Sequence, residues 1–240
     1  MKANGNLSLG LVLLSLGASR SAQAQSWSFT GNMHYYRPLH TATKLQNGQV
    51  LVAGGREIGN AYQNTAEVYN PSTGVFTLTG NLNTGREYHV ATLLPSGEVL
   101  IAGGFGPGTC PDCLSSAKLY NPSTEQFTVT GSMTTGICIP TATLLDNGRV
   151  LVFQGTLAEL YDPSAGTFSV TGSLNAPRTF ASATPLPHGK ALIAGGLRGS
   201  STDFRSAELY DPSTAAFTLT GIMDTARAYH TGTLMNNGEF

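Results

Sequence analysis

The chain has 240 residues, of which 40 % are hydrophobic and 11 % are charged, and its formal net charge is −1 at pH 7. This length and apolar content are sufficient for a sizeable core in one or two domains. The near-neutral charge leaves neither a basic surface for nucleic acid nor an acidic tail, so we expect no nucleic-acid partner.

The N-terminus has the pattern of an export signal. Lys2 precedes an apolar stretch over residues 7–16, and the small residues Ala22 and Ala24 precede Gln25. We therefore predict a signal peptide over residues 1–24 and a domain over residues 25–240 that is secreted, periplasmic or on the cell surface. The apolar stretch is far shorter than the roughly 20 residues that cross a bilayer, so no membrane span is expected after cleavage.

The sequence after the signal repeats itself. A twelve-residue pattern that contains Tyr, Asn/Asp-Pro-Ser, Phe and Thr-Gly begins at Tyr69, Tyr120, Tyr161 and Tyr210, at spacings of 51, 41 and 49 residues. Between these segments lies an apolar run followed by two glycines, as in residues 99–104. Self-similarity at this period indicates an array or a propeller built from one repeated unit.

Each unit is predicted to hold four strands, named A to D in chain order. Strand A is rich in threonine, as at residues 89–94, and ends at an Asn-Gly or Ser-Gly pair that suits a tight hairpin. Strand B, as at residues 99–102, is apolar at every position, which indicates burial on both faces. Strand C ends in an Asn/Asp-Pro-Ser turn, and strand D alternates as a half-exposed outer strand. Tyr and Phe, seven residues apart, would then meet across the C–D hairpin.

A double glycine, a tyrosine and an aromatic residue seven positions later resemble the kelch motif, as in Gly103, Gly104, Tyr120 and Phe127. The version with Asp/Asn-Pro-Ser-Thr resembles the propeller region of galactose-oxidase-like and bacterial kelch proteins. The resemblance covers residues 26–240 and implies an all-β, kelch-type β-propeller with four complete four-stranded blades.

Two further segments are expected to contribute strands to an incomplete closing blade. Residues 26–33 align with strand D, and residues 227–236 align with strand A. The kelch resemblance implies six or seven blades, and an open edge of unpaired strand favours aggregation. We therefore expect that residues 25–240 lack C-terminal blades that continue past Phe240.

Charged residues also recur at fixed positions. Arginine stands at the start of strand A in four units, and in strand C a glutamate lies 19 residues before three of these arginines. Lys118 lies 19 residues before Ile137, so acid and base are lost together, as expected for an ion pair. We predict three partly buried structural ion pairs, Glu67–Arg86, Glu159–Arg178 and Glu208–Arg227. A ring of arginines near the channel mouth that binds an anionic ligand is the alternative.

Histidine and cysteine are the residue types of this chain that most often bind transition metals. His40, His89 and His230 occupy one repeat position in strand A, which indicates an architectural role and no metal site. Export implies an oxidising compartment, so we predict a structural disulfide between Cys110 and Cys113, while the state of Cys138 stays open. A zinc site would need two further ligands, and a thioredoxin-type site would need a βαβ context that the sequence lacks.

Length variation is concentrated between strands B and C, at residues 56–63, 105–114 and 197–205. Loops of variable length on one face are typical of recognition surfaces. The candidate binding residues in these loops are Arg56, Glu57, Phe105, Asp112, Arg198, Asp203 and Arg205.

The sequence favours a non-catalytic module that binds a protein or a glycan through these loops without a cofactor. The alternative is the propeller part of a galactose-oxidase-like copper oxidase, or of another carbohydrate-active enzyme, with catalytic residues downstream of residue 240. That resemblance implies a copper centre with two histidines, two tyrosines and a cysteine crosslinked to one tyrosine. We find no such converging set in this sequence.

Overall fold

A computed structural model describes residues 29–59, 61–108, 113–199 and 202–235. The chain divides into two units, residues 1–30 and residues 31–240. The predicted signal peptide and the residues Asn60, Cys110 and Asp112 lie outside the described residues. All strands belong to the second unit, and no described helix is long and apolar enough to cross a bilayer.

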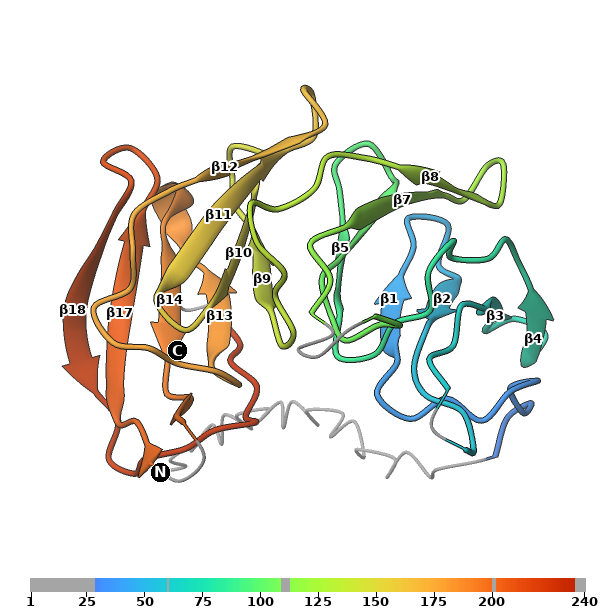
Figure 1. Ribbon diagram of the computed structural model, residues 1–240, viewed down its shortest axis with the longest axis horizontal. Coiled ribbons are helices and arrows are strands. Elements are labelled where there is room, and N and C mark those ends of the chain that lie inside the picture. Colours follow the sequence, from blue (N-terminus) through green and yellow to red (C-terminus); the bar gives the residue numbers. More distant parts are fainter. Residues whose placement is uncertain (1–28, 60, 109–112, 200–201, 236–240) are drawn as a thin grey trace, which may run out of the picture. The chain divides into compact units, whose positions relative to one another are not determined.

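The second unit contains four antiparallel sheets, each of four strands in up-and-down order, which we call blades 1 to 4 (Figure 1). Blade 1 is formed by β1 (Thr41–Lys44), β2 (Val50–Ala53), β3 (Ala66–Asn70) and β4 (Val75–Leu78). Blade 2 is formed by β5 (Val90–Leu93), β6 (Val99–Ala102), β7 (Ala117–Asn121) and β8 (Gln126–Val129). Blade 3 is formed by β9 (Thr141–Leu144), β10 (Val150–Gln154), β11 (Leu157–Asp162) and β12 (Thr167–Val170). Blade 4 is formed by β13 (Ser182–Pro185), β14 (Ala191–Ala194), β17 (Ser206–Asp211) and β18 (Ala216–Ile222).

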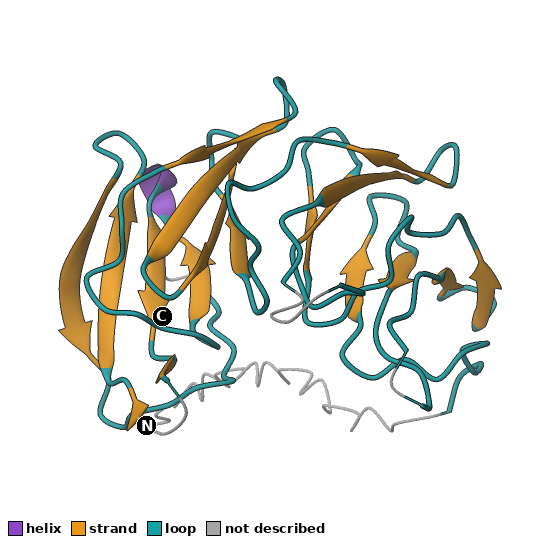
Figure 2. Ribbon diagram, viewed as in Figure 1, coloured by secondary structure: helices purple, strands orange, loops and turns teal. Residues whose placement is uncertain are grey.

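Two smaller elements interrupt blade 4. A short hairpin of β15 (Leu197–Arg198) and β16 (Thr202–Asp203) lies between β14 and β17. The turn between β13 and β14 is the 3₁₀ helix Pro187–Gly189, drawn in purple in Figure 2. Here His188 replaces the Asn or Ser of the other units and adopts a left-handed φ of 65°. The predicted four-strand unit is therefore confirmed, with this turn as its main local departure.

The aromatic pairs predicted across each C–D hairpin are formed. In each pair, the tyrosine of strand C stands opposite the phenylalanine of strand D in the strand register. The ring centroids are 4.7 Å apart in Tyr69–Phe76, 4.8 Å in Tyr120–Phe127, 4.8 Å in Tyr161–Phe168 and 4.7 Å in Tyr210–Phe217. These pairs close the outer half of every blade.

The hydrophobic core lies between neighbouring blades. In β6, Val99 and Ile101 pack in one cluster with residues of β2, whereas Leu100 and Ala102 pack in another with residues of β10. All four residues of β6 are fully buried. Successive side chains of a strand point to opposite faces of its sheet, so a strand covered on both sides must be apolar throughout. This explains the unbroken apolar runs of strand B.

The blades are also joined by hydrogen bonds at fixed repeat positions. The tyrosine hydroxyl of strand C shares a hydrogen bond with the threonine that follows strand D of the preceding blade. The oxygen–oxygen distances are 2.8 Å for Thr79–Tyr120, 2.7 Å for Thr130–Tyr161 and 2.7 Å for Thr171–Tyr210. The glycine after strand B donates its backbone N–H to the following unit, as from Gly55 to the carbonyl oxygen of Arg86 at 2.8 Å. Backbone and hydroxyl groups thus fasten one blade to the next.

The ion pairs predicted between units are wrong. None of Glu67–Arg86, Glu159–Arg178 and Glu208–Arg227 is formed among the described residues. The arginine side chain instead runs along its own blade and bonds to carbonyl oxygens at the end of strand B and the start of strand C. It therefore meets the glutamate 30 residues later. Two such buried pairs are present, Arg37–Glu67 at 2.7 Å and Arg178–Glu208 at 2.8 Å.

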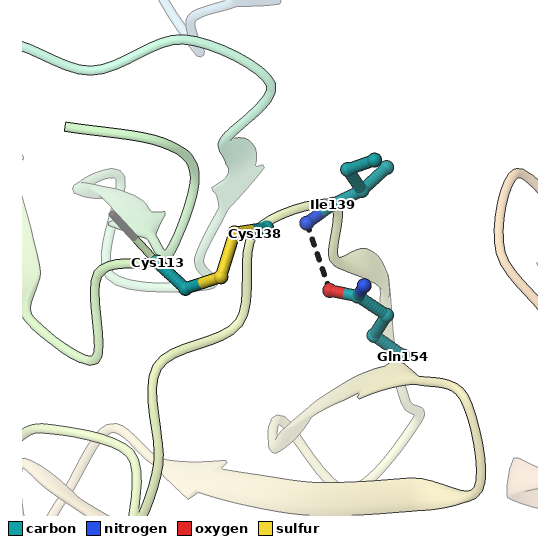
Figure 3. Close-up of a disulfide and its surroundings, with 4 residues drawn as sticks. All are labelled: Cys113, Cys138, Ile139 and Gln154. Atoms are coloured by element: carbon teal, nitrogen blue, oxygen red, sulfur yellow. Dashed lines mark hydrogen bonds between the residues drawn. A yellow bond between two sulfur atoms is a disulfide. The ribbon is translucent and has the colours of Figure 1, made fainter. Parts of the chain in front are cut away.

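The predicted disulfide between Cys110 and Cys113 is also wrong, because Cys113 is bonded to Cys138 (Figure 3). Ile137 donates its backbone N–H to the carbonyl oxygen of Leu114 at 3.1 Å, which brings the next residue, Cys138, beside Cys113. The bond joins the loop between β6 and β7 to the connection between β8 and β9.

The two segments assigned to a closing blade carry no strand where the structure describes them. Residues 29–33 and 227–235 are without strand assignment. A strand requires a partner strand for its backbone hydrogen bonds, and neither segment is paired in a sheet.

Candidate binding site on the loop face

The variable loops meet the inter-blade connections at one end of the blades, which we call the loop face. It is formed by the loops between strands B and C and by the segments that lead from strand D into strand A of the next blade. Backbone bridges join the two kinds of segment, Glu87 with Phe105 and Thr179 with Leu197. The candidate binding residues chosen from the sequence therefore neighbour a second set of residues, just before strand A.

This second set has an unusual backbone conformation. Leu39, Tyr88, Phe180 and Tyr229 occupy the same repeat position and have φ angles of 62°, 55°, 55° and 56°. Bulky side chains rarely adopt a left-handed conformation, and such strain is concentrated at ligand-binding and active sites. Hydrogen bonds hold the position, from the Tyr229 N–H to the carbonyl oxygen of Phe180 at 3.0 Å and from the Tyr88 N–H to that of Leu39 at 3.3 Å.

The third unit departs from this pattern. Ile139, at the matching position, does not adopt a left-handed φ. Its N–H donates instead to the side-chain oxygen of Gln154 at 2.8 Å, as Figure 3 shows. Gln154 replaces the first glycine of the double-glycine pair, and the loop after it is reduced to two residues between β10 and β11. Blade 3 therefore contributes neither an aromatic ring at this position nor a long loop.

The strained residues bring aromatic rings from three units together. The ring of Tyr88 contacts Phe105 edge-on at 6.0 Å between centroids and Phe180 at 6.3 Å. Phe180 stacks on Tyr229 at 3.9 Å. We call these four residues the aromatic cluster. Its rings are half-buried except for Tyr229, which is exposed.

A partly buried ion pair lies beside the aromatic cluster. The Arg56 guanidinium contacts the Glu87 carboxylate at 2.9 Å and lies over the ring of Tyr62 at 5.6 Å. Glu87 is buried and forms the backbone bridge with Phe105, whereas the Arg56 side chain is 34 % exposed. Burial raises the pKa of Glu87, and Arg56 acts in the opposite direction. Glu87 thus holds a partly exposed guanidinium at the edge of the aromatic rings.

The other predicted binding residues are more dispersed. Glu57 lines a shallow depression of about 210 Å³ together with Tyr35, Tyr36, Ile58 and Gln63. Arg198 and Asp203 are exposed on the β15–β16 hairpin, whose Leu197 bridges to Thr179, next to Phe180. Arg205 donates from Nε to the carbonyl oxygen of Met223 at 2.8 Å. The structure therefore brings Arg56 and Phe105 together around Glu87 and places the blade 4 residues on the flank.

Comparison with solved structures decides the fold. The chain is similar to the protein described as "Structure of YjhT", with a TM-score of 0.68 and 16 % sequence identity over 84 % of this chain and 75 % of that chain. The chain has a β-propeller fold. No protein-family model matches the sequence, and a search of curated proteins also gives no match.

Sequence reasoning overlooked the residues at the centre of the propeller's loop face. Glu87, Tyr88, Phe180 and Tyr229 were not among the candidates. The repeats did contain a signal, because an aromatic residue stands two positions after the arginine in three units, as in Arg86 and Tyr88. The left-handed conformation of these aromatic residues is not indicated by the sequence, because tyrosine and phenylalanine rarely adopt a positive φ.

Two of the three repeated histidines, His89 and His230, join neighbouring blades of the propeller, whereas His40 bonds to the carbonyl oxygen of Arg37 at 2.6 Å. His89 Nε2 shares a hydrogen bond with Thr41 Oγ1 at 2.8 Å, and His230 Nε2 shares one with Ser182 Oγ at 3.0 Å. Burial, with smaller effects of Arg86 and His40, lowers the pKa of His89 to about 3. Within the described ranges, no three His, Cys, Asp or Glu side chains gather as a metal site.

Proposed function

We propose that this protein is an exported, non-catalytic propeller of the kelch type that binds a glycan on its loop face. The observation that carries the proposal is the aromatic cluster, in which Tyr88, Phe180 and Tyr229 are held in left-handed conformations beside the Arg56–Glu87 pair. The left-handed backbone presents these rings where the loops between strands B and C meet the segments that lead into strand A.

The chemistry of the site suits a sugar. Aromatic rings present flat apolar surfaces with a negative face, against which the C–H groups of a pyranose ring can pack. Ligand sites combine such apolar walls with a few placed polar groups, and here Arg56 and the exposed Glu57 can bond to hydroxyl groups. Tyrosine and phenylalanine have few rotatable bonds, so ordering them on binding costs little entropy.

The test is a glycan array probed with the wild-type protein and two variants. Tyr88→Asn removes the ring but keeps a residue type that tolerates a left-handed φ. We expect it to weaken glycan binding by at least about tenfold while the melting temperature is preserved. Val129→Ser, on the exposed part of β8, is the matched control and should bind as the wild type does.

Two results would contradict the proposal. Unchanged glycan binding by Tyr88→Asn would remove the aromatic cluster from the site. Absence of glycan binding by the wild type, together with reproducible capture of one protein partner, would assign the face to protein recognition.

Export is supported by the signal pattern at residues 1–24. Amino-terminal sequencing of protein recovered outside the cytoplasm should give Gln25 as the first residue. A start at Met1 in that fraction would contradict the assignment.

A further inference from the structure

A buried carboxylate of strand C completes the same arrangement in blades 1 and 4. In blade 4, one oxygen of Glu208 accepts from Arg178 Nη2 at 2.8 Å, and the other accepts from the backbone N–H of Asn175 at 2.8 Å. In blade 1, Glu67 likewise accepts from Arg37 Nη2 at 2.7 Å and from the backbone N–H of His34 at 2.8 Å. Both oxygens of the carboxylate are therefore used. The arginine bonds to one of them, and the preceding connection bonds to both, since the next N–H reaches the arginine's oxygen at 3.3 Å in blade 4 and 3.4 Å in blade 1.

Blade 3 keeps the carboxylate although it has no arginine. Glu159 accepts hydrogen bonds from the backbone N–H of Thr134, at 3.1 Å to each oxygen, and from its hydroxyl at 2.8 Å. Thr134 occupies the repeat position of Asn175. The backbone donor at this position thus binds a carboxylate in three of the four blades, with or without the guanidinium.

Blade 2 has the arginine but no carboxylate. Arg86 bonds to the carbonyl oxygens of Gly103 and Ser116, each at 3.0 Å, as its counterparts do in blades 1 and 4. Lys118 takes the place of the glutamate, opposite Ile101 and Val129 in the strand register. The guanidinium is therefore positioned as in the other blades, but it faces a second cation.

The two cations of blade 2 lack a compensating charge. Arg86 is fully buried and Lys118 is 6 % exposed. Within the described part of the chain, no carboxylate lies within ion-pair distance of either group. Burial lowers the pKa of Arg86 to about 10, and burial together with Arg86 lowers the pKa of Lys118. A buried charge is costly unless it is paired, and two adjacent like charges add repulsion to this cost.

The backbone donors of the missing carboxylate are also free. Asn83 and Thr84 occupy the repeat positions of Asn175 and Ala176, whose N–H groups both bond to Glu208. The N–H groups of Asn83 and Thr84 have no hydrogen-bond acceptor among the described residues. Asn83 is exposed to solvent and Thr84 is half-buried.

We propose that Arg86, Lys118 and the backbone N–H groups of Asn83 and Thr84 form a binding site for a carboxylate anion from solution. The anion supplies, between the two cations and the two N–H groups, the carboxylate that the glutamate side chain supplies in the other blades. The arrangement favours a carboxylate over a spherical halide, because in the other blades the matching donors bond to the two separate oxygen atoms of one planar group. This proposal does not rest on the proposed glycan binding.

The test uses sodium formate as the probe, with sodium chloride at equal concentration as the control for ionic strength. Thermal unfolding of the wild type should shift upward by about 3–6 °C at formate concentrations ten times the dissociation constant, and much less in chloride. Lys118→Glu restores the carboxylate of the other blades, so it should melt at a higher temperature without formate and show no formate-specific shift.

A second measurement does not depend on any variant. Broadening of the ¹³C-formate NMR signal by the wild-type protein should be reversed by acetate, which competes for the same donors. The proposal is overturned by an equal formate shift in the wild type and Lys118→Glu, by equal effects of chloride and formate, or by the absence of both the shift and the broadening.

Discussion

Gly104 donates its backbone N–H to the carbonyl oxygen of Ile137 at 2.9 Å, which ties the end of β6 to the connection that leads into blade 3. Gly104 has a φ of 95°, and a Cβ atom there would collide with the carbonyl oxygen of Glu87 and with the backbone of His89. The second glycine of the repeat is thus required by two separate constraints, its backbone angle and the closeness of a neighbouring segment.

Replacement of Gly104 by alanine should therefore be costly. We expect Gly104→Ala to lower the free energy of unfolding by about 3 kcal/mol or more, since a collision with backbone is added to the left-handed strain. Gly48→Ala is the matched control, because Gly48 has a φ of 86° with no atom within 4 Å of the added Cβ, and it should cost about 1–2 kcal/mol. Urea unfolding of both variants measures the difference, and equal losses would show that the close approach is unimportant.

The disulfide should contribute measurably to stability. Cys113 and Cys138 are 25 residues apart, so loss of the bond in Cys138→Ala should lower the free energy of unfolding by about 3 kcal/mol. Cys110→Ala should leave the free energy of unfolding unchanged. Peptide mapping without reductant should recover a crosslinked fragment that contains Cys113 and Cys138, and a Cys110–Cys113 crosslink in its place would contradict the structure.

The buried ion pair of blade 4 allows a paired experiment with blade 3. Glu208→Gln leaves the guanidinium of Arg178 buried without its counter-charge, and we expect a loss of about 3 kcal/mol. Glu159→Gln removes a buried carboxylate that faces no arginine, and the new amide oxygen can still accept a hydrogen bond from Thr134. We therefore expect the free energy of unfolding to fall by only about 1 kcal/mol. Chemical denaturation measures the free energy of unfolding of both variants. A larger decrease in Glu159→Gln than in Glu208→Gln would refute this prediction.

The pH dependence of stability should reveal His89. Its folded-state pKa of about 3 lies below the ordinary 6.5, so below pH 6.5 the unfolded chain binds a proton that the folded protein does not. Stability from this group is therefore present above pH 6.5 and is lost progressively as the pH falls toward 3. Between pH 6.5 and pH 5 we expect a loss of about 2 kcal/mol.

Variants separate this effect from other titrating groups. His89→Gln should flatten the profile between pH 6.5 and pH 5, whereas His188→Gln, at an exposed turn, should leave it unchanged. A wild-type profile that stays flat over this interval would contradict the assignment.

The sequence was sufficient to predict the repeating architecture because each strand carries its own local signal. The apolar run of β6, the Asn-Pro turn after Tyr120 and the seven-residue interval to Phe127 depend only on neighbours in the chain. Blade number within the described residues and the aromatic pairs followed from these signals, and the structure confirms both.

The partners of long-range contacts were not predictable in the same way. Arg86 and Arg178 each have a strand C glutamate position both before and after them, and spacing alone does not say which of the two positions the side chain reaches. The choice depends on the carbonyl oxygens of Gly195 and Ser206, which direct Arg178 along its own blade to Glu208. The same limit applies to Cys113, whose partner is fixed by a backbone bond between two distant segments.

The candidate site was located only in outline. The variable length of the loops indicated Arg56 and Phe105 as candidate binding residues, and both lie beside Glu87 in the structure. The aromatic cluster was not predicted because Tyr88 stands at a repeated position of the units. A residue that recurs at one repeat position suggests a structural role and not a binding role. The ring contacts of the cluster depend on a strained backbone that the residue types themselves disfavour.

The alternating burial of β6 has a further consequence for how the protein unfolds. Val99 and Ile101 belong to one core and Leu100 and Ala102 to the next, so no blade possesses a complete core of its own. A blade cut out of the chain would expose both apolar faces of its second strand to water. The packing of β6 therefore depends on the blades on both sides of it, and a disturbance in this one strand is felt in two cores.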